Sequence, residues 1–407
     1  METAILSRYL ETPDGSEADA ILRACVHCGF CTATCPTYQL LGDELDGPRG
    51  RIYLIKQVLE GKPVSRLTQR HLDRCLTCTA CETTCPSGVR YHRLLDIGRG
   101  IVEQAVPRPW RERITRRLLR WVMPYPRRFA ALLSLARIAR PLLPGKLARK
   151  VPDPQVKNRR PAPVHERRML VLEGCVQSVA TPRTNDALAA VLDRLGIALV
   201  SAPEAGCCGA VDYHLAAHEA GLAAARANID AWWPFIEAGA EALIVSASGC
   251  GAMVKEYGYL LRSDPNYADK AERVASLARD ASEVLAGEDL SHLSEIGRGR
   301  RIAFHAPCTL QHSQKLPGRV EEILRRLGFE LTEVTDAHLC CGSAGTYSLL
   351  QEEISGKLLG NKVRTLQAGD PELIATANVG CQLHLQTGAS VPVRHWIELL
   401  APVEQAV

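Results

Sequence analysis

Apolar residues form two kinds of pattern in the second half of the chain. Short runs rich in aliphatic residues occupy 169–174, 242–248, 301–306 and 373–380, and a cysteine follows each run within two residues. Helical patterns, such as DALAAVLDRLG and VEEILRRLG, separate these runs. Strands that alternate with helices predict a parallel α/β sheet, in which ligands bind beyond the carboxyl ends of the strands.

The same half of the chain contains two copies of one module. Three stretches of the first copy recur in the second: RMLVLEGC (168–175) as RIAFHAPC (301–308), EAGCCGAVDY (204–213) as AHLCCGSAGTY (337–347), and ALIVSASGC (242–250) as LIATANVGC (373–381). A repeat of this length indicates two domains of the same fold. We expect cysteine-rich module 1 at 166–290 and module 2 at 298–402.

The first part of the chain has a helical pattern. Residues 52–59 form one apolar helical face, made by Ile52, Leu54, Ile55, Val58 and Leu59. We expect a small α-helical domain over 15–100. The predicted fold is therefore multidomain, with this α-helical domain followed by two repeated α/β modules, each built on a parallel sheet.

A basic segment lies between these parts. Residues 107–150 contain thirteen Lys and Arg and one acidic residue, Glu112, in a chain whose net charge is only +4. Apolar residues alternate with the charges, so the segment predicts one or two basic amphipathic helices, broken by Pro124, Pro126, Pro141 and Pro144. Contact with an anionic membrane surface, docking to an acidic partner and a solvated face over another helix all fit this pattern. We expect no nucleic-acid partner, because no binding module accompanies the charge.

A linker rich in proline and arginine ends the basic segment near residue 165. We therefore expect residues 101–165 to comprise the basic helices and this linker, and the first module to begin directly afterwards.

Sixteen cysteines limit the chemistry and the compartment. The first twenty residues have neither a basic start followed by an apolar core nor a small-residue cleavage site, and no run of 18 apolar residues occurs. We therefore expect a cytoplasmic protein whose clustered thiols serve metal or redox chemistry rather than disulfides.

Eight of the cysteines form two blocks with the spacing C-x2-C-x2-C-x3-C-P, at 25–36 and 75–86. In two-cluster ferredoxins the first three thiolates of a block bind one [4Fe–4S] cluster and the fourth crosses to the other cluster. On this template the ligand sets are Cys25, Cys28, Cys31 and Cys85 for the first cluster, and Cys75, Cys78, Cys81 and Cys35 for the second. Zinc knuckles are the alternative, but they leave the middle cysteine of each block idle.

The other eight cysteines divide equally between the modules. We expect Cys175, Cys207, Cys208 and Cys250 to converge in module 1, and Cys308, Cys340, Cys341 and Cys381 in module 2, because all follow strand ends or neighbouring loops. Gly206, Gly209 and Gly342 would permit tight turns there. Four converging thiols favour a metal centre over packed core thiols.

The CCG modules resemble the cysteine-rich domains of heterodisulfide reductase subunits. The whole chain resembles the glycolate oxidase (glycolate dehydrogenase) iron–sulfur subunits, through LRACVHCGFCTATCPTYQLLGDELDGPRGRIYLIKQVLEG, CETTCPSGVRYH, EAGCCGAVDYHL and LCCGSAGTY. The resemblance implies a complex in which flavin subunits, which carry FAD, oxidise glycolate to glyoxylate. Electrons then pass through the two [4Fe–4S] clusters of this chain to a membrane acceptor such as quinone, from a peripheral position on the cytoplasmic face of the inner membrane.

The modules depart from the heterodisulfide reductase pattern at one place. There the last cysteine often begins a CxxC, which supplies a fifth thiol for a noncubane iron–sulfur cluster. This chain has Met253 and His384 at the corresponding positions. A noncubane cluster, zinc, or no metal in one copy therefore stay open.

Two functions follow from these patterns. The first is an electron-transfer subunit without catalytic residues of its own, because no GxGxxG fingerprint for flavin or nicotinamide occurs and a partner must supply the hydride acceptor. The second is a catalytic, heterodisulfide reductase-like subunit with His214, His305 or His338 as proton donors. The equivalent subunit of a D-lactate or glycerol-3-phosphate dehydrogenase is a further alternative, since the flavin partner selects the substrate.

Overall fold

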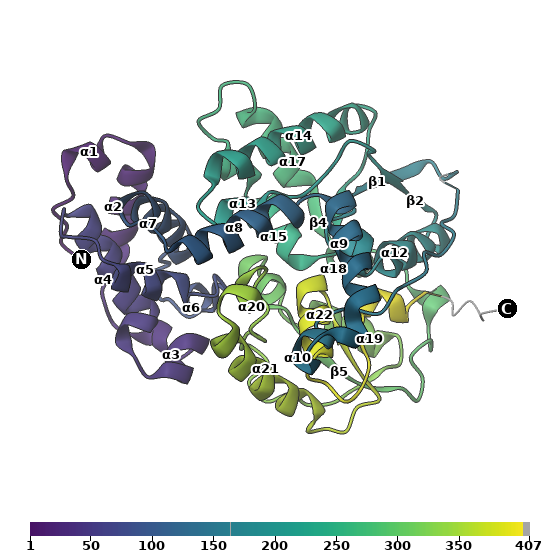
Figure 1. The fold of residues 1–407 in the computed structure, drawn as a ribbon. Coiled ribbons are helices and arrows are strands. Elements are labelled where there is room, and N and C mark those ends of the chain that lie inside the picture. Colours follow the sequence, from purple (N-terminus) through teal and green to yellow (C-terminus); the bar gives the residue numbers. More distant parts are fainter. Residues whose placement is uncertain (163, 402–407) are drawn as a thin grey trace.

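The computed structural model describes residues 1–162 and 164–401, which form a helical N-terminal domain, a helical connecting segment and two α/β modules (Figure 1). The N-terminal domain lies to one side of the two modules, and the connecting helices α8 and α9 run across the modules (Figure 1). The predicted fold class is confirmed.

The N-terminal domain consists of short helices around two cysteine-bearing loops. Proline occupies the first helical position of α2, α3 and α4, where its fixed φ angle suits a helix start. The predicted face of α4 packs inward, with Ile55 and Leu59 against Leu94 and Leu95. The elements are α1 (Ser7–Leu10), α2 (Pro13–Ala24), η1 (Phe30–Thr32), α3 (Pro36–Leu41), η2 (Glu44–Asp46), α4 (Pro48–Leu59), α5 (Arg66–Asp73), α6 (Ala80–Thr83) and α7 (Tyr91–Ala105).

Module 1 is built on a parallel four-stranded sheet in the order β2-β1-β3-β4. The predicted run at 169–174 overlaps β1 (Arg167–Val171), and the run at 242–248 contains β3 (Leu243–Val245). The remaining strands are β2 (Ile197–Ser201) and β4 (Ala278–Asp280). The helices are α11 (Gln177–Ala180), α12 (Arg183–Arg194), α13 (Ala210–His214), α14 (His218–Glu237), α15 (Ser248–Lys255), α16 (Tyr257–Leu260), α17 (Ala268–Leu277) and α18 (Ala281–Ala286), with the turn η4 (Ser291–Leu293).

Module 2 repeats this topology in the order β6-β5-β7-β8, again with parallel pairs. The predicted repeat is therefore a structural repeat. Its strands are β5 (Arg301–His305), β6 (Glu330–Leu331), β7 (Leu373–Thr376) and β8 (Val393–His395). Its helices and turns are η5 (Thr309–Ser313), α19 (Arg319–Arg326), α20 (Tyr347–Leu350), α21 (Glu352–Gln367), α22 (Val379–Gln386) and η6 (Trp396–Leu399).

The two modules share one apolar core. Leu188 of module 1 and Ile323 and Trp396 of module 2 belong to the same buried cluster. A polar contact also joins the two modules, because the His395 ring of module 2 lies 3.0 Å from the carbonyl oxygen of Ser246 in module 1. The modules therefore pack as a single body rather than as two domains on a flexible linker.

The connecting segment forms the predicted basic helices, α8 (Trp110–Val122) and α9 (Pro126–Ala139), followed by η3 (Arg140–Leu142) and α10 (Gly145–Ala148). The break between α8 and α9 falls at the predicted prolines, since Pro126 begins α9. Among the helices that the structure describes, none is both long and apolar enough to cross a membrane.

The predicted domain ranges 15–100, 101–165, 166–290 and 298–402 stay predictions. Helix α7 runs through residue 100 to Ala105, and the backbone of Leu6 bonds to Leu59 on α4, 3.0 Å away. Residue 402, the predicted end of module 2, lies outside the described residues.

An ionic cluster around the buried Asp46 stabilises the N-terminal domain. The Asp46 carboxylate lies 2.7 Å from Arg74, 2.9 Å from the ring of His71 and 3.5 Å from Arg51, whose side chain is also buried. Arg51 further donates to the carbonyl of His71, at 2.7 Å. A buried charge of this kind is tolerated only while its partners remain.

We predict that Asp46→Asn lowers the free energy of unfolding by about 3–5 kcal/mol, because it leaves the Arg51 charge buried without its counter-charge. Anaerobic chemical denaturation followed by circular dichroism measures the loss. The control is Asp19→Asn, which removes an exposed pair with Arg23 and should cost at most about 1 kcal/mol. Equal effects of the two substitutions would contradict the role of the buried cluster.

Candidate metal centres

Two pockets in the N-terminal domain are lined by the cysteines of the two blocks. Cys25, Cys28, Cys31 and Cys85 line the first pocket, and Cys35, Cys75, Cys78 and Cys81 line the second, while Cys81 also reaches the first. The fourth cysteine of each block thus lies at the pocket of the other block. This is the exchange that the ferredoxin template predicts.

The two loops around these pockets have the same backbone conformation. His27 and Gly29 in the first loop, and Thr77 and Thr79 in the second, have left-handed φ angles between 54° and 89°. Non-glycine residues rarely adopt this conformation, and it recurs at the same two places of the C-x2-C-x2-C spacing. The loops are therefore bent in the same way, so that three thiols of each loop face one pocket.

The donor set at both pockets fits an iron–sulfur cluster, because each pocket is lined by at least four cysteines. Burial is the main cause that raises the pKa of Cys78 and Cys81 well above the ordinary value of a thiol. Thiolates at these positions consequently need a bound cation to remain ionised. Arg51 and Tyr91 line the second pocket, and Arg51 adds a fixed positive charge there.

The two pockets differ in their contact with solvent. Cys28 at the first pocket is exposed, and so are the neighbouring Val26 and Phe30. All four cysteines of the second pocket are buried. The first pocket therefore lies at the surface, and the second lies inside.

The second pocket adjoins module 2. Cys78 packs in one buried cluster with Cys308 and Cys340, together with Tyr347. The hydroxyl of Tyr347 donates to the carbonyl of Arg74, at 2.9 Å. Two further contacts flank this interface: Thr79 with Ser313 at 2.8 Å, and Thr83 with His312 at 3.1 Å. The thiols of the N-terminal domain and of module 2 thus lie in neighbouring sites.

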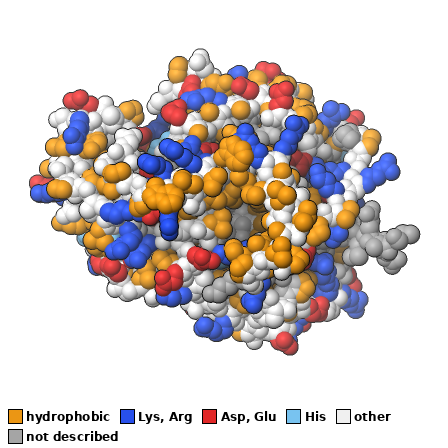
Figure 2. Space-filling view, in the orientation of Figure 1, with side chains coloured by type: hydrophobic (Ala, Val, Ile, Leu, Met, Phe, Trp, Pro, Cys, Tyr) orange, Lys and Arg blue, Asp and Glu red, His pale blue; other side chains and the backbone are white. Residues whose placement is uncertain are grey.

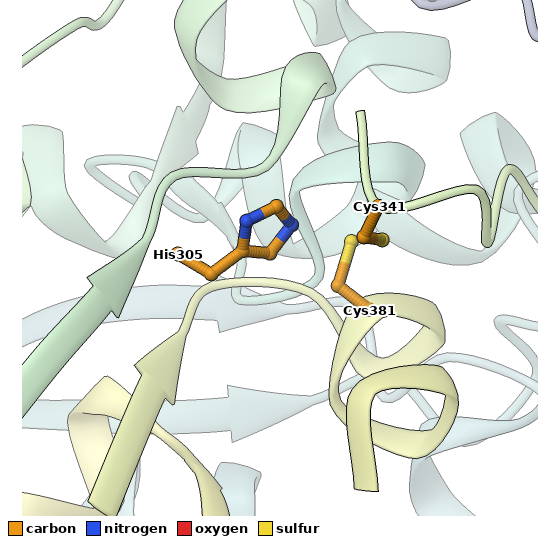
Figure 3. Close-up of side chains that lie close together, drawn as sticks. All are labelled: His305, Cys341 and Cys381. Carbon is orange, nitrogen blue, oxygen red and sulfur yellow. The ribbon is translucent and has the colours of Figure 1, made fainter. Parts of the chain in front are cut away.

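The cysteines of module 2 divide into two groups. The sulfurs of Cys308 and Cys340 lie 3.8 Å apart, on the side of Cys78. Cys341 and Cys381 instead face His305, and the ligand atoms of these three residues lie within 4.8 Å of one another (Figure 3). All five residues are buried. Gly342, as predicted, has a left-handed backbone, and a Cβ there would meet the carbonyl oxygen of Ser355 at 2.7 Å.

Module 1 brings its thiols together without a histidine. The sulfurs of Cys175 and Cys207 lie 3.5 Å apart, and Cys208 interacts with Cys207 and Cys250. Among the described residues, no three histidine, cysteine or acidic ligand atoms of this module lie within 4.8 Å of one another. Gly209 has the predicted left-handed backbone, but Gly206 does not, so Gly206 is not required by a tight turn.

The histidines named as candidate proton donors have different surroundings. His214 faces Asp96 of the N-terminal domain, 3.3 Å away, and the carbonyl of His338 accepts a hydrogen bond from His312. Only His305 joins a cysteine group. At the position of the absent CxxC cysteine, the ring of His384 lies 3.1 Å from the Ser355 hydroxyl, and Met253 is buried in the core of module 1.

Sequence reasoning missed two features of these sites. The pattern did not indicate that Arg51, on the apolar helix α4, would line the second pocket. It named His305 as a candidate proton donor, but it did not indicate which cysteines His305, at the end of β5, would face. The signal for His305 was its place three residues before Cys308, at the carboxyl end of a predicted strand.

Comparisons with known proteins agree with this architecture. A model described as a 4Fe-4S dicluster domain matches residues 21–89, and a model described as a cysteine-rich domain matches residues 169–255 and 302–386. The glycolate oxidase iron-sulfur subunit of Escherichia coli is 61% identical over 100% of this chain and 99% of its own length. The probable glycolate oxidase iron-sulfur subunit of Bacillus subtilis is 32% identical over 94% of this chain and 92% of its own. Lactate utilization protein A of Geobacillus thermodenitrificans is 26% identical over 56% of this chain and 95% of its own length.

The exchange of fourth ligands generates a prediction for paired variants. In a Cys28→Ala background, only the cluster of the second pocket should form, with about four iron atoms per chain. Adding Cys85→Ala should leave this cluster intact, whereas adding Cys35→Ala should remove it. Iron analysis gives the number of iron atoms per chain in each double variant. Electron paramagnetic resonance of the dithionite-reduced protein shows whether the remaining cluster is present. If instead Cys85→Ala removed the remaining cluster and Cys35→Ala spared it, each block would bind its own cluster.

Proposed function

This chain belongs to the family of the glycolate oxidase iron–sulfur subunits, and we propose that it carries electrons from flavin-binding partner subunits, which hold FAD, to a membrane acceptor such as quinone. It is an iron–sulfur electron-transfer subunit of an oxidoreductase. The observation that carries the proposal is the row of thiols from the exposed first pocket, through the buried second pocket, to module 2.

We assign the ligands of the two clusters from this arrangement. Each would be held by three cysteines of one block and the last cysteine of the other: Cys25, Cys28, Cys31 and Cys85, and Cys75, Cys78, Cys81 and Cys35. When bound, such clusters accept and release single electrons. Support comes from the four sulfurs at each pocket and from the matching loop conformations.

The chain's own residues keep the two pockets in different environments. Leu76, Tyr347 and the apolar surface of module 2 cover the second pocket and exclude water from it. Arg51 lies beside this pocket, with its charge paired to the buried Asp46 carboxylate. The first pocket lies open between Val26 and Phe30, so a partner subunit can approach it closely.

Oxidation of glycolate to glyoxylate is assigned to the partner subunits. Removal of a hydride from an α-hydroxy acid needs an acceptor such as flavin, and the sequence lacks a dinucleotide fingerprint. The lactate utilization relatives support lactate as an alternative substrate of the complex. A heterodisulfide reductase-like catalytic role is less well supported, because His214 and His338 do not join the cysteine groups.

We also propose that α8 to α10 form a membrane-contact surface, defined by Trp110, Leu118, Trp121, Leu135, Ile138 and Leu142, which are all exposed. Trp121 is 57% exposed and Ile138 78%. Figure 2 shows hydrophobic side chains gathered over these helices with basic side chains beside them. Arg128 stacks over the rings of both Trp121 and Tyr125. Exposed aromatic and aliphatic side chains next to arginines fit the headgroup region of an anionic bilayer.

The electron-transfer proposal predicts a specific defect in a reconstituted complex. Cys78→Ser should abolish glycolate-dependent quinone reduction, because it removes a ligand of the buried second pocket. The flavin subunits should still oxidise glycolate with an artificial dye as acceptor, which serves as the internal control. Quinone reduction at the wild-type rate in this variant would contradict the proposed path.

The membrane proposal predicts a loss of vesicle binding. The double variant Trp121→Ser, Ile138→Ser should bind vesicles with anionic lipid at least about tenfold more weakly, because it removes apolar side chains that the bilayer surface would bury. Sedimentation with vesicles measures binding. Tyr53→Ser, which alters an exposed aromatic residue on α4, is the matched control and should bind as the wild type does. Unchanged binding by the double variant would show that another surface contacts lipid.

A further inference from the structure

His305 is a buried polar residue without a hydrogen-bond partner for one of its ring nitrogens. It ends strand β5, and 2% of its surface is exposed. Its Nε2 atom is buried and lacks a partner. Leaving such a group buried without a partner destabilises the fold, and a bound ligand at this nitrogen would remove that cost.

The surroundings of His305 supply that explanation. Its imidazole faces the sulfurs of Cys341 and Cys381, and one ligand atom from each residue lies within a common 4.8 Å (Figure 3). The three residues come from three separate segments: the end of β5, the CCG loop, and the start of α22. A metal ion at their centre would draw the atoms inward to bonding distance and would satisfy both the imidazole and the thiols.

The other histidine of the area has a different role. His384 occupies the position of the missing CxxC cysteine, but its Nε2 lies 3.1 Å from the hydroxyl of Ser355, which itself donates to the carbonyl of Gly342. His384 is therefore engaged in a hydrogen-bond network. His305 is the histidine left to bind a metal with these two cysteines.

Module 1 cannot form the same site. The repeat aligns Cys308 with Cys175 and hence His305 with Leu172, which is buried at the end of β1. A leucine offers no ligand. The two modules, although they share topology and cysteine spacing, are therefore chemically different at this position.

We propose that module 2 binds a single zinc ion through His305, Cys341 and Cys381, and that module 1 lacks this site. Mixed nitrogen and sulfur ligands suit zinc, which prefers a tetrahedral shell of cysteine and histidine. The fourth position is open to Cys308, Cys340 or water. This inference rests on the expectation from the sequence that the thiols of module 2 form a metal centre, and it names the metal and a ligand outside the repeated cysteines.

The test uses the full chain, purified anaerobically, with zinc and iron measured per chain and zinc examined by X-ray absorption. The wild type should contain about one zinc per chain. Its shell should include sulfur at about 2.3 Å and imidazole nitrogen at about 2.0–2.1 Å. The sulfur count assigns the fourth ligand.

Variants separate the role of His305 from a general loss of structure. His305→Leu should fold, because module 1 carries leucine at this place, and it should bind zinc more than about 100-fold more weakly, since even loss of an outer partner costs 10–100-fold. His305→Cys should retain zinc with sulfur in place of nitrogen. His384→Gln is the matched control and should keep the wild-type zinc content and spectrum.

Each contrary outcome has a distinct meaning. Zinc retained by His305→Leu, or a wild-type shell without imidazole, overturns the role of His305 while module 2 still binds a metal. Zinc lost from His384→Gln but kept in His305→Leu assigns the ligand to the other histidine and overturns the inference. A wild type with neither zinc nor iron beyond about eight atoms per chain overturns the underlying proposal of a metal in module 2, and leaves the clusters of the N-terminal domain unaffected.

Discussion

The burial of thiols is the physical constraint on which this structure depends. Twelve of the sixteen cysteines are buried, and burial raises the pKa of a thiol because it removes the solvent that would stabilise the thiolate. A buried thiolate must therefore be matched by positive charge. The fold gathers the sulfurs in compact groups so that one cation can serve several thiols, and it sets Arg51 beside the second pocket. That arginine in turn requires Asp46, which explains why the deepest ion pairs of the N-terminal domain lie next to its most buried cysteines.

The two modules illustrate how a duplicated fold can diverge in chemistry without changing its backbone. Strand order, parallel pairing and the left-handed glycine after the paired cysteines are the same in both. The difference arises at single positions at the strand ends, where Leu172 faces an apolar core and His305 faces two thiols. Because strand ends support the ligand-binding edge of a parallel sheet, one substitution there alters the site with little cost to the fold. The shared core around Trp396 keeps the modules in a fixed relation while their sites differ.

Local patterns in the sequence predicted much of this architecture, and contacts between distant segments accounted for the remainder. The spacing of Cys25 to Cys35 fixes a loop that bends around one site, and runs such as 301–306 predict strands, because both depend on near neighbours along the chain. The contact between Cys78 and Cys308 depends on how two separately folded units pack, and no periodicity encodes that. Arg51 on an otherwise apolar helix face, and His305 at the end of a strand, are polar groups whose neighbours come from other elements. The surroundings of such residues are determined by the tertiary structure alone.

The cysteines at the first pocket of the N-terminal domain are more exposed than those at the second. Electron exchange with another subunit requires close approach, and only the first pocket has an exposed cysteine, Cys28, among the eight of the N-terminal domain. The second pocket is covered by module 2, and Arg51, which is paired with Asp46, lies beside it. Module 2, packed on the inner pocket and sharing a core with module 1, is therefore the part of the chain that lies next to the buried thiols of the N-terminal domain.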